Sequence, residues 1–230
     1  MEEMALLKSR TAKKQPYITY EEYLNLAGDA QITEWVDGEV IIHMPPKHIH
    51  QITLGFLHQL LSLFVNLFNL GIVQIAPFEV KLPSSSREPD ILFVASEHLD
   101  WLTEERLVGP PDLIVEIVSK DSVQRDRDDK FGEYREAGVR EYWIIDPRPG
   151  KQRADFFHLD ETGAYRLFAT EDDERVESHV LSGFWLRPAW LWQADTLDPL
   201  TLFFEMRGIS VEQAQQIQQM LRAGAGEVES

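Results

Sequence analysis

The chain has 230 residues, 43% of them hydrophobic, and carries a net charge of −17 at pH 7 with no cysteine. This length favours one domain with elaborations or two small ones, and the lack of cysteine excludes a disulfide framework and a thiolate metal site. The acidic balance argues against a protein that coats nucleic acid through a basic surface. Because polar residues interrupt the longest apolar stretch, residues 60–70, we expect a cytoplasmic protein with no membrane partner.

The N-terminal part of the sequence predicts a leader, a short helix and a hairpin. Residues 1–16 have no apolar pattern and are expected to form a mobile leader. Residues 18–28 are typical of a short helix with Thr19 as its N-cap. The pair Asp37-Gly38 predicts the turn of a hairpin over residues 32–44.

A long helix and three strands are expected next. Apolar residues recur at steps of three and four over residues 49–69, which indicates a helix, and Gly71 is expected to end it. The three strands are expected over residues 72–82, 90–94 and 113–118. The polar residues 84–88 are expected to form a tight connection between the first two strands.

The remaining chain predicts a helix, a strand, a hairpin and a last helix. The helix is expected over residues 123–137 with Gly138 at its end, and the strand over residues 140–147. A hairpin turns near residues 161–163, and Ser210 is expected to cap the last helix. We therefore expect a leader, a single domain and a C-terminal helix with its tail, over residues 1–16, 17–206 (core 49–147) and 207–230.

Glu116 is a charged residue inside the otherwise apolar segment DLIVEIVS, residues 112–119. A buried carboxylate is costly unless it is paired or binds a cation. Strand alternation places Glu116 on the same face as Ile114 and Val118. The alternative is that Glu116 pairs with a buried arginine.

Asp90 begins a second apolar run, EPDILFV, and alternation places it on one face with Leu92 and Val94. If this strand is the neighbour of the strand that carries Glu116, the two acids meet at one place on the sheet. Two close carboxylates favour a hard divalent cation such as Mg²⁺. The alternative is that Asp90 only caps a turn after Pro89.

Lys130 and Arg127 fall inside the apolar arc of the helix predicted over residues 123–137. A lysine there can point into a polar site and stabilise the charge that develops on a phosphate. The alternatives are that these side chains extend to the edge of the arc, or that Lys130 pairs with Asp126, four residues earlier on the helix.

Two further residues are weaker candidates. Glu79 alternates with Phe78 and Val80, and could be a third metal ligand or lie on an exposed strand face. His50 stands near the start of the long helix, and could take part in the site or only cap and pack.

Four segments together resemble the Uma-two family of restriction endonucleases, in the PD-(D/E)XK nuclease superfamily: EPDILFV, GPPDLIVEIVSKDS, RDRDDKFGEYREAGV and REYWIIDP. The resemblance extends from Ile18 to Pro147 and, more weakly, to Phe184. It implies an α/β (α+β) fold with a restriction-endonuclease-like mixed β-sheet core flanked by helices, here with additional N-terminal and C-terminal β-hairpins.

The resemblance also implies roles for individual residues. Asp90 corresponds to the acid of the PD motif, and Glu116 to the first acid of the (D/E)XK motif. Val118 stands where that motif has its lysine. The superfamily sometimes supplies the lysine from the next helix, which implies Lys130, with Lys120 as the rival.

The sequence therefore predicts an endonuclease that hydrolyses phosphodiester bonds of nucleic acid, DNA in the first place, with a homodimer as one expected state. Asp90, Glu116 and Lys130 are the predicted catalytic residues, and Asp90, Glu116 and Glu79 the predicted ligands of Mg²⁺ or Mn²⁺. One alternative is a catalytically silent module on a nuclease fold that binds nucleic acid or protein. Another is an enzyme that processes sugars or nucleotides with the same carboxylates.

Overall fold

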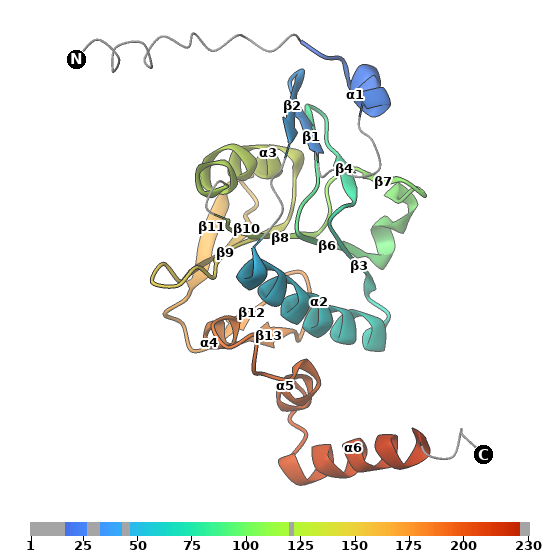
Figure 1. Ribbon diagram of the computed structural model, residues 1–230, viewed down its shortest axis with the longest axis vertical. Coiled ribbons are helices and arrows are strands. Elements are labelled where there is room, and N and C mark those ends of the chain that lie inside the picture. The colour runs from blue at the N-terminus through green and yellow to red at the C-terminus, as the bar shows by residue number, and fades with distance from the viewer. Residues whose placement is uncertain (1–16, 27–32, 43–46, 120–121, 226–230) are drawn as a thin grey trace, which may run out of the picture.

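A mixed β-sheet of six strands forms the centre of the computed structural model, which describes residues 17–26, 33–42, 47–119 and 122–225 (Figure 1). In sheet order the strands are β11 (Tyr165–Thr170), β10 (Arg153–Leu159), β9 (Glu141–Asp146), β8 (Leu113–Ile117), β6 (Ile91–Ala95) and β3 (Gly71–Ile75). β8 and β9 run parallel, and the other neighbours run antiparallel. The predicted mixed sheet is confirmed. The predicted leader, the last five residues and Lys120 lie outside the described residues.

A second, five-stranded sheet stands beside the central one (Figure 1). In sheet order its strands are β2 (Glu39–Ile42), β1 (Thr33–Val36), β5 (Ser85–Arg87), β4 (Glu79–Lys81) and β7 (Arg106–Val108). Two short strands, β12 (Val176–Glu177) and β13 (Trp185–Leu186), pair separately. Both predicted hairpins are present: β1–β2 turns at Asp37-Gly38, where both residues have positive φ, and β10–β11 turns near residue 163.

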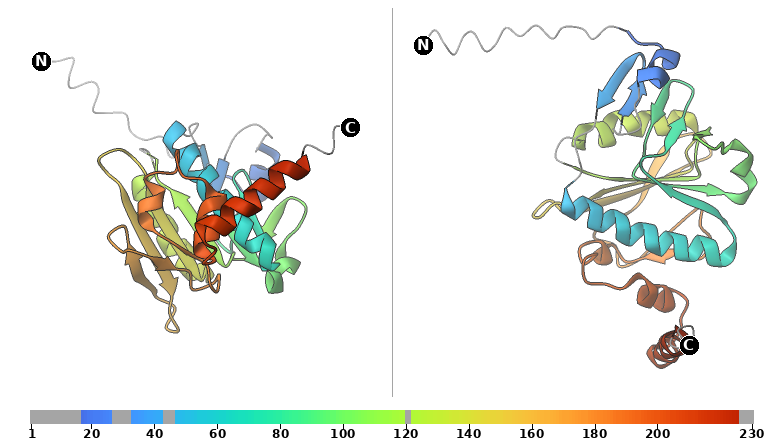
Figure 2. Two further views of the ribbon diagram at one scale, coloured as in Figure 1. Left: turned by 90° about the horizontal axis from the view of Figure 1, so that it is seen from below. Right: turned by 45° about the vertical axis from the view of Figure 1, so that its right-hand side comes forward.

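Helices of different lengths surround the two sheets. They are α1 (Tyr20–Leu26), α2 (His48–Phe68), the 3₁₀ helix η1 (Ser96–Trp101), the π-helical turn η2 (Arg125–Asp129), α3 (Lys130–Ala137), α4 (Pro188–Leu191), α5 (Pro199–Met206) and α6 (Val211–Ala225). Figure 1 shows α2 along one side of the sheet and α3 on the other. The further views agree that α5 and α6 lie beyond α2, away from the second sheet (Figure 2).

The alternation of side chains along β8 divides the core into two layers. Leu113, Val115 and Ile117 belong to the apolar cluster that includes the buried face of α2. Ile114 and Val118 belong to the other cluster, which includes Tyr134 of α3. Because side chains alternate along a strand, Glu116 faces α3, on the same side as Ile114 and Val118, as the sequence predicted.

Most predicted helix ends are confirmed by their caps. Thr19 Oγ1 accepts a hydrogen bond from Glu22 N at 3.2 Å, while Glu22 Oε2 accepts one from Thr19 N at 2.8 Å, which is a capping box. Ser210 Oγ accepts from Gln213 N at 3.3 Å at the start of α6. Gly138 ends α3 with a φ of 91°.

The segment after α2 differs from the prediction. Asn69, with a φ of 51°, is the left-handed residue that ends the helix. Gly71 instead begins β3 with a φ of 146°, where its backbone passes close to Val94. The strand predicted over residues 72–82 is two strands in different sheets, because the chain turns between β3 and β4 near Pro77.

The predicted connection at residues 84–88 is also wrong. Its middle part is the buried strand β5 of the second sheet. Ser85, Ser86 and Arg87 are at most 1% exposed. A polar composition suggested a loop, but these residues are buried because Glu79 of the neighbouring strand β4 satisfies Ser86 and Glu34 of the distant strand β1 satisfies Arg87.

α2 is also a longer apolar helix than the interrupted stretch at residues 60–70 suggested. It is long and apolar enough to cross a membrane, but the core helix of a soluble protein often has the same length and composition. Its buried residues, including Leu57, Leu60 and Leu61, belong to the core cluster shared with the central sheet.

We predict that Gly71→Ala destabilises the fold by more than about 2 kcal/mol, since a Cβ atom there would lie 2.0 Å from the Val94 carbonyl oxygen at a φ that favours glycine. Gly55→Ala, inside α2, is the control: nothing lies within 4 Å of its Cβ, so it should stabilise the helix by up to about 1 kcal/mol. Urea unfolding of both variants checks this, and equal stabilities would contradict the account of Gly71.

Candidate active site

Asp90 and Glu116 lie side by side at the end of two neighbouring strands. The antiparallel register of β6 and β8 pairs Ile91 with Val115, so Asp90, one residue before β6, comes opposite Glu116. The Ile117 N–H donates a hydrogen bond to Asp90 Oδ2 at 2.7 Å and fixes this carboxylate against β8. The structure therefore brings the two predicted acids together on one face of the sheet.

Glu116 is buried, and two side chains of the next helix bind the same carboxylate oxygen. Lys130 Nζ donates to Glu116 Oε1 at 2.8 Å, and the Tyr134 hydroxyl donates to it at 2.8 Å. Lys130 is 3% exposed and Tyr134 fully buried. The third predicted catalytic residue thus lies at the site, with its ammonium group toward the sheet.

The π-helical turn just before α3 adds another buried acid. Asp126 is 1% exposed, and its Oδ1 lies 3.7 Å from Lys130 Nζ. The intrahelical pair that competed with a site role for Lys130 therefore exists, but it is longer than the contact with Glu116. π turns of this kind are frequent at functional sites. Arg127, also predicted inside the arc, reaches instead across to Asp155 of β10.

Glu34 of β1 is a residue that the sequence analysis missed. It is fully buried, and its Oε1 lies 3.2 Å from Lys130 Nζ while its Oε2 accepts from Arg87 Nη1 at 3.0 Å. Arg87, 1% exposed, also binds Glu133 of α3 through two nitrogen atoms. A charge inside the short sequence segment ITEWV was the available signal, but its partners Arg87 and Lys130 lie more than fifty residues away.

His50 was a weak candidate, and the structure places it at the site. Its Nε2 lies 3.1 Å from Asp90 Oδ1 and 3.2 Å from Asp90 Oδ2. The ring is buried, and its Nδ1 has no hydrogen-bond partner. His50 therefore helps to position Asp90.

The electrostatics of the site follow from burial and crowding. Burial raises the pKa of Glu116; Lys130 opposes this shift, and Asp126, Asp90 and Glu34 add to it. Burial likewise raises the pKa of Asp126, with Asp90 adding to the shift. Burial disfavours the Lys130 ammonium, but Glu116, Glu34 and Asp126 outweigh it and raise its pKa. The lysine therefore stays charged among carboxylates that exceed it in number.

Glu79 is not brought to this group. Among the described residues its carboxylate contacts Ser86 Oγ at 2.7 Å, Arg106 Nε at 3.2 Å and the Tyr20 hydroxyl. The reason is the break between β3 and β4, which carries Glu79 into the second sheet. The geometry gives no support to a role as third metal ligand.

A second group with metal-ligand chemistry lies at the other end of β8. Oxygen and nitrogen atoms of Glu97, His98 and Asp112 come within 4.8 Å of one another. Arg140 Nη1 lies 3.1 Å from Asp112 Oδ1 and 3.7 Å from Glu97 Oε1, and Ala95 N–H donates to Asp112 at 2.8 Å. This group is thus already compensated by a cation.

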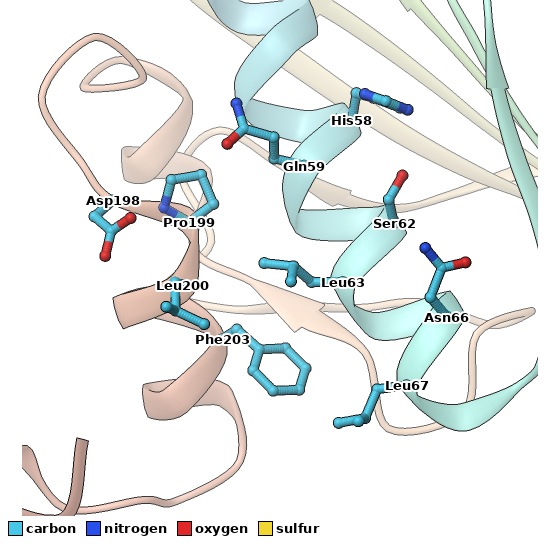
Figure 3. Close-up of a pocket in the computed structure, with 10 residues that line it drawn as sticks. All are labelled: His58, Gln59, Ser62, Leu63, Asn66, Leu67, Asp198, Pro199, Leu200 and Phe203. Carbon is cyan, nitrogen blue, oxygen red and sulfur yellow. The ribbon is translucent and has the colours of Figure 1, made fainter. Parts of the chain in front are cut away.

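A pocket lies between α2 and α5, away from these acids (Figure 3). Its apolar lining comes from Leu63, Leu67, Leu200 and Phe203. None of the predicted site residues lines it, so the chemistry described above belongs to the sheet face under α3.

The mixed sheet, with two acids on neighbouring strands and a lysine that contacts one of them, matches the restriction-endonuclease-like fold expected from the sequence. The chain belongs to the Uma2 family, described as "Putative restriction endonuclease", whose family model matches residues 20–189. The match covers all of the residues placed at the site, from Glu34 to Tyr134.

A solved structure supports the same fold. It is that of a protein from Anabaena variabilis, described as a "putative nuclease belonging to DUF820", with a TM-score of 0.65 and 18% sequence identity. The match covers 77% of this chain and 98% of the other. At this identity the likeness shows a shared fold. No protein of curated function matches the chain.

Glu88 predicts a pH dependence of stability. Burial first, then the charges of Glu34 and Glu79, raise its pKa from 4.5 to about 7, and its Oε2 is buried without a hydrogen-bond partner. Between these pH values the folded state holds a proton that the unfolded state has lost, so the stability from this group falls as pH rises from about 4.5 to about 7.

We therefore expect Glu88→Gln in EDTA to be more stable than the parent at pH 8 by about 1 to 2 kcal/mol, since solvent still reaches part of the side chain. Near pH 4.5 the two proteins should be equal. Glu136→Gln, an exposed change on α3, is the control and should leave the pH profile of the parent unchanged. Urea unfolding across this range measures the difference, and a parallel profile for Glu88→Gln would contradict it.

Proposed function

We propose that the protein is a metal-dependent endonuclease that hydrolyses phosphodiester bonds of nucleic acid, with DNA as the expected substrate. One observation carries the proposal. The Lys130 ammonium lies 2.8 Å from the carboxylate of Glu116, and Glu116 stands on β8 opposite Asp90 at the start of the neighbouring strand β6. Membership of the family described as "Putative restriction endonuclease" supports the same class of reaction.

The donor set fits a hard divalent cation. Four carboxylates lie on this face: Glu34, Asp90, Glu116 and Asp126. Three cations act on them: Lys130 and Arg87 by direct contact, and Arg125 by its charge on Asp126. Negative charge is therefore in excess, and carboxylate oxygens are the ligands that Mg²⁺ and Mn²⁺ take. Asp90 and Glu116 would hold the ion. When bound, it would supply positive charge that favours deprotonation of an attacking water and stabilises charge on the phosphate.

The chain's own residues supply positioning and charge. Lys130 is held on the inner side of α3, where an ammonium can donate to a phosphate oxygen as negative charge develops there. Tyr134 fixes Glu116 by its hydroxyl, and His50 fixes Asp90. These contacts support a site with its reacting groups set before the substrate arrives.

The second candidate is a module with the nuclease fold that binds nucleic acid or protein without cutting. Two observations favour it: Val118 occupies the motif's lysine position, and Lys130 is bound by Glu34 as well as Glu116. For either candidate function we also propose a homodimer and a cytoplasmic location, and both proposals rest on the sequence alone.

We predict that the parent protein binds Mn²⁺ and that Asp90→Asn or Glu116→Ala abolishes binding, because each removes a carboxylate ligand. Glu79→Gln is the matched control, since Glu79 contacts Ser86 and Arg106 in the second sheet. Isothermal titration calorimetry measures all four proteins. Unchanged Mn²⁺ affinity in Glu116→Ala would remove Glu116 from the metal site.

We predict that Lys130→Met lowers the rate of metal-started cleavage about 10²-fold or more, as the loss of one electrostatic stabiliser does, while Mn²⁺ binding persists. The assay follows a labelled duplex and a labelled single strand. Circular dichroism checks the fold, since the change leaves buried acids without a cation.

One arginine variant and one lysine variant serve as controls for this assay. Arg127→Met removes a cation from the same helix whose partner is Asp155, and it should leave cleavage near the parent rate. Lys120→Met should also have a much smaller effect than Lys130→Met. Full activity in Lys130→Met with loss in Lys120→Met would transfer the role to Lys120. No cleavage by the parent with any metal would favour the binding module.

A further inference from the structure

The π-helical turn at Arg125–Asp129 sets an acid and a cation on the same side of the helix. Asp126 and Lys130, four residues apart, are 1% and 3% exposed, whereas Asp128 and Asp129 between them are exposed. The turn is held in place by the Tyr142 hydroxyl, which donates to the Asp126 carbonyl oxygen at 2.8 Å. The buried acid is thus part of a fixed structure.

The carboxylate of Asp126 is only half satisfied. The Ser122 side chain hydrogen-bonds to it, but its buried Oδ1 has no hydrogen-bond partner. Lys130 Nζ is 3.7 Å from this oxygen, which is too far for a hydrogen bond. Because an unsatisfied buried oxygen costs free energy, it indicates a partner that is present when the protein works.

Asp126 Oδ1 lies close to the carboxylate of Glu116. Glu116 Oε1 and Asp126 Oδ1 both lie within 3.7 Å of the Lys130 nitrogen. Asp90 is near enough for its charge to act on both carboxylates. Three acids from a strand, a strand end and a helical turn therefore converge on one small region.

We propose that Asp126 is a third carboxylate ligand of the divalent cation held by Asp90 and Glu116, an assignment that rests on the proposed function. Lys130 keeps a second carboxylate, Glu34 at 3.2 Å, which Arg87 holds in place. The ammonium therefore stays beside the site through Glu34 when the ion takes the oxygens of Glu116 and Asp126.

The test measures Mn²⁺ binding to the full chain by isothermal titration calorimetry. Asp126→Asn keeps the shape of the side chain and should weaken Mn²⁺ binding at least about 10-fold, the loss that removal of a partner in a metal site gives. Asp129→Asn, an exposed acid on the same turn, is the matched control and should bind as the parent does. In EDTA, Asp126→Asn should melt at or above the parent temperature, since it removes a buried negative charge that lies near other carboxylates.

The outcomes separate this inference from the proposed function. No Mn²⁺ binding by the parent defeats both. Parent binding with unchanged affinity in Asp126→Asn overturns only the role of Asp126. A crystal of the parent soaked in Mn²⁺ gives a second test that needs no folded variant: anomalous density in direct contact with Asp126 supports the inference, and an ion on Asp90 and Glu116 alone overturns it.

Discussion

The rest of the structure depends on one buried cation. The ammonium of Lys130 contacts carboxylates from a central strand, from the N-terminal hairpin and from its own helix. Burying such charges without their partners costs several kcal/mol, so the hairpin, the strand and the helix must be in place together. The second sheet is therefore attached to the central one by charge, through Glu34 and Arg87, as well as by apolar packing.

The sequence was sufficient for features that depend on local pattern. Glu116 could be named as a candidate site residue because a single acid interrupts a β-branched run. The alternation of side chains along the strand also predicted correctly the face of the sheet on which Glu116 lies. Lys130 was found because it lies inside the apolar arc of a short helix. Capping at Thr19 and Gly138 needs only neighbouring residues, so these helix ends were also predictable.

Features that depend on distant partners were not predictable. Glu34 and Arg87 are buried because each satisfies the other across more than fifty residues, and Glu133 completes Arg87 from a third segment. The polar sequence around Arg87 suggested a loop for the same reason. Glu79 shows a further limit: alternation gives the face of a strand but not the sheet to which that strand belongs.

Val118 has a consequence for how this protein can vary. It is 1% exposed and packs with Ile114 and Tyr134, at the position where the strand motif of the superfamily has a lysine. With the cation supplied by the helix, every residue of this strand except Glu116 is free to serve packing. Under the proposed function, substitutions that improve the core and substitutions that change the reaction would fall on different elements, and each could be selected with little cost to the other.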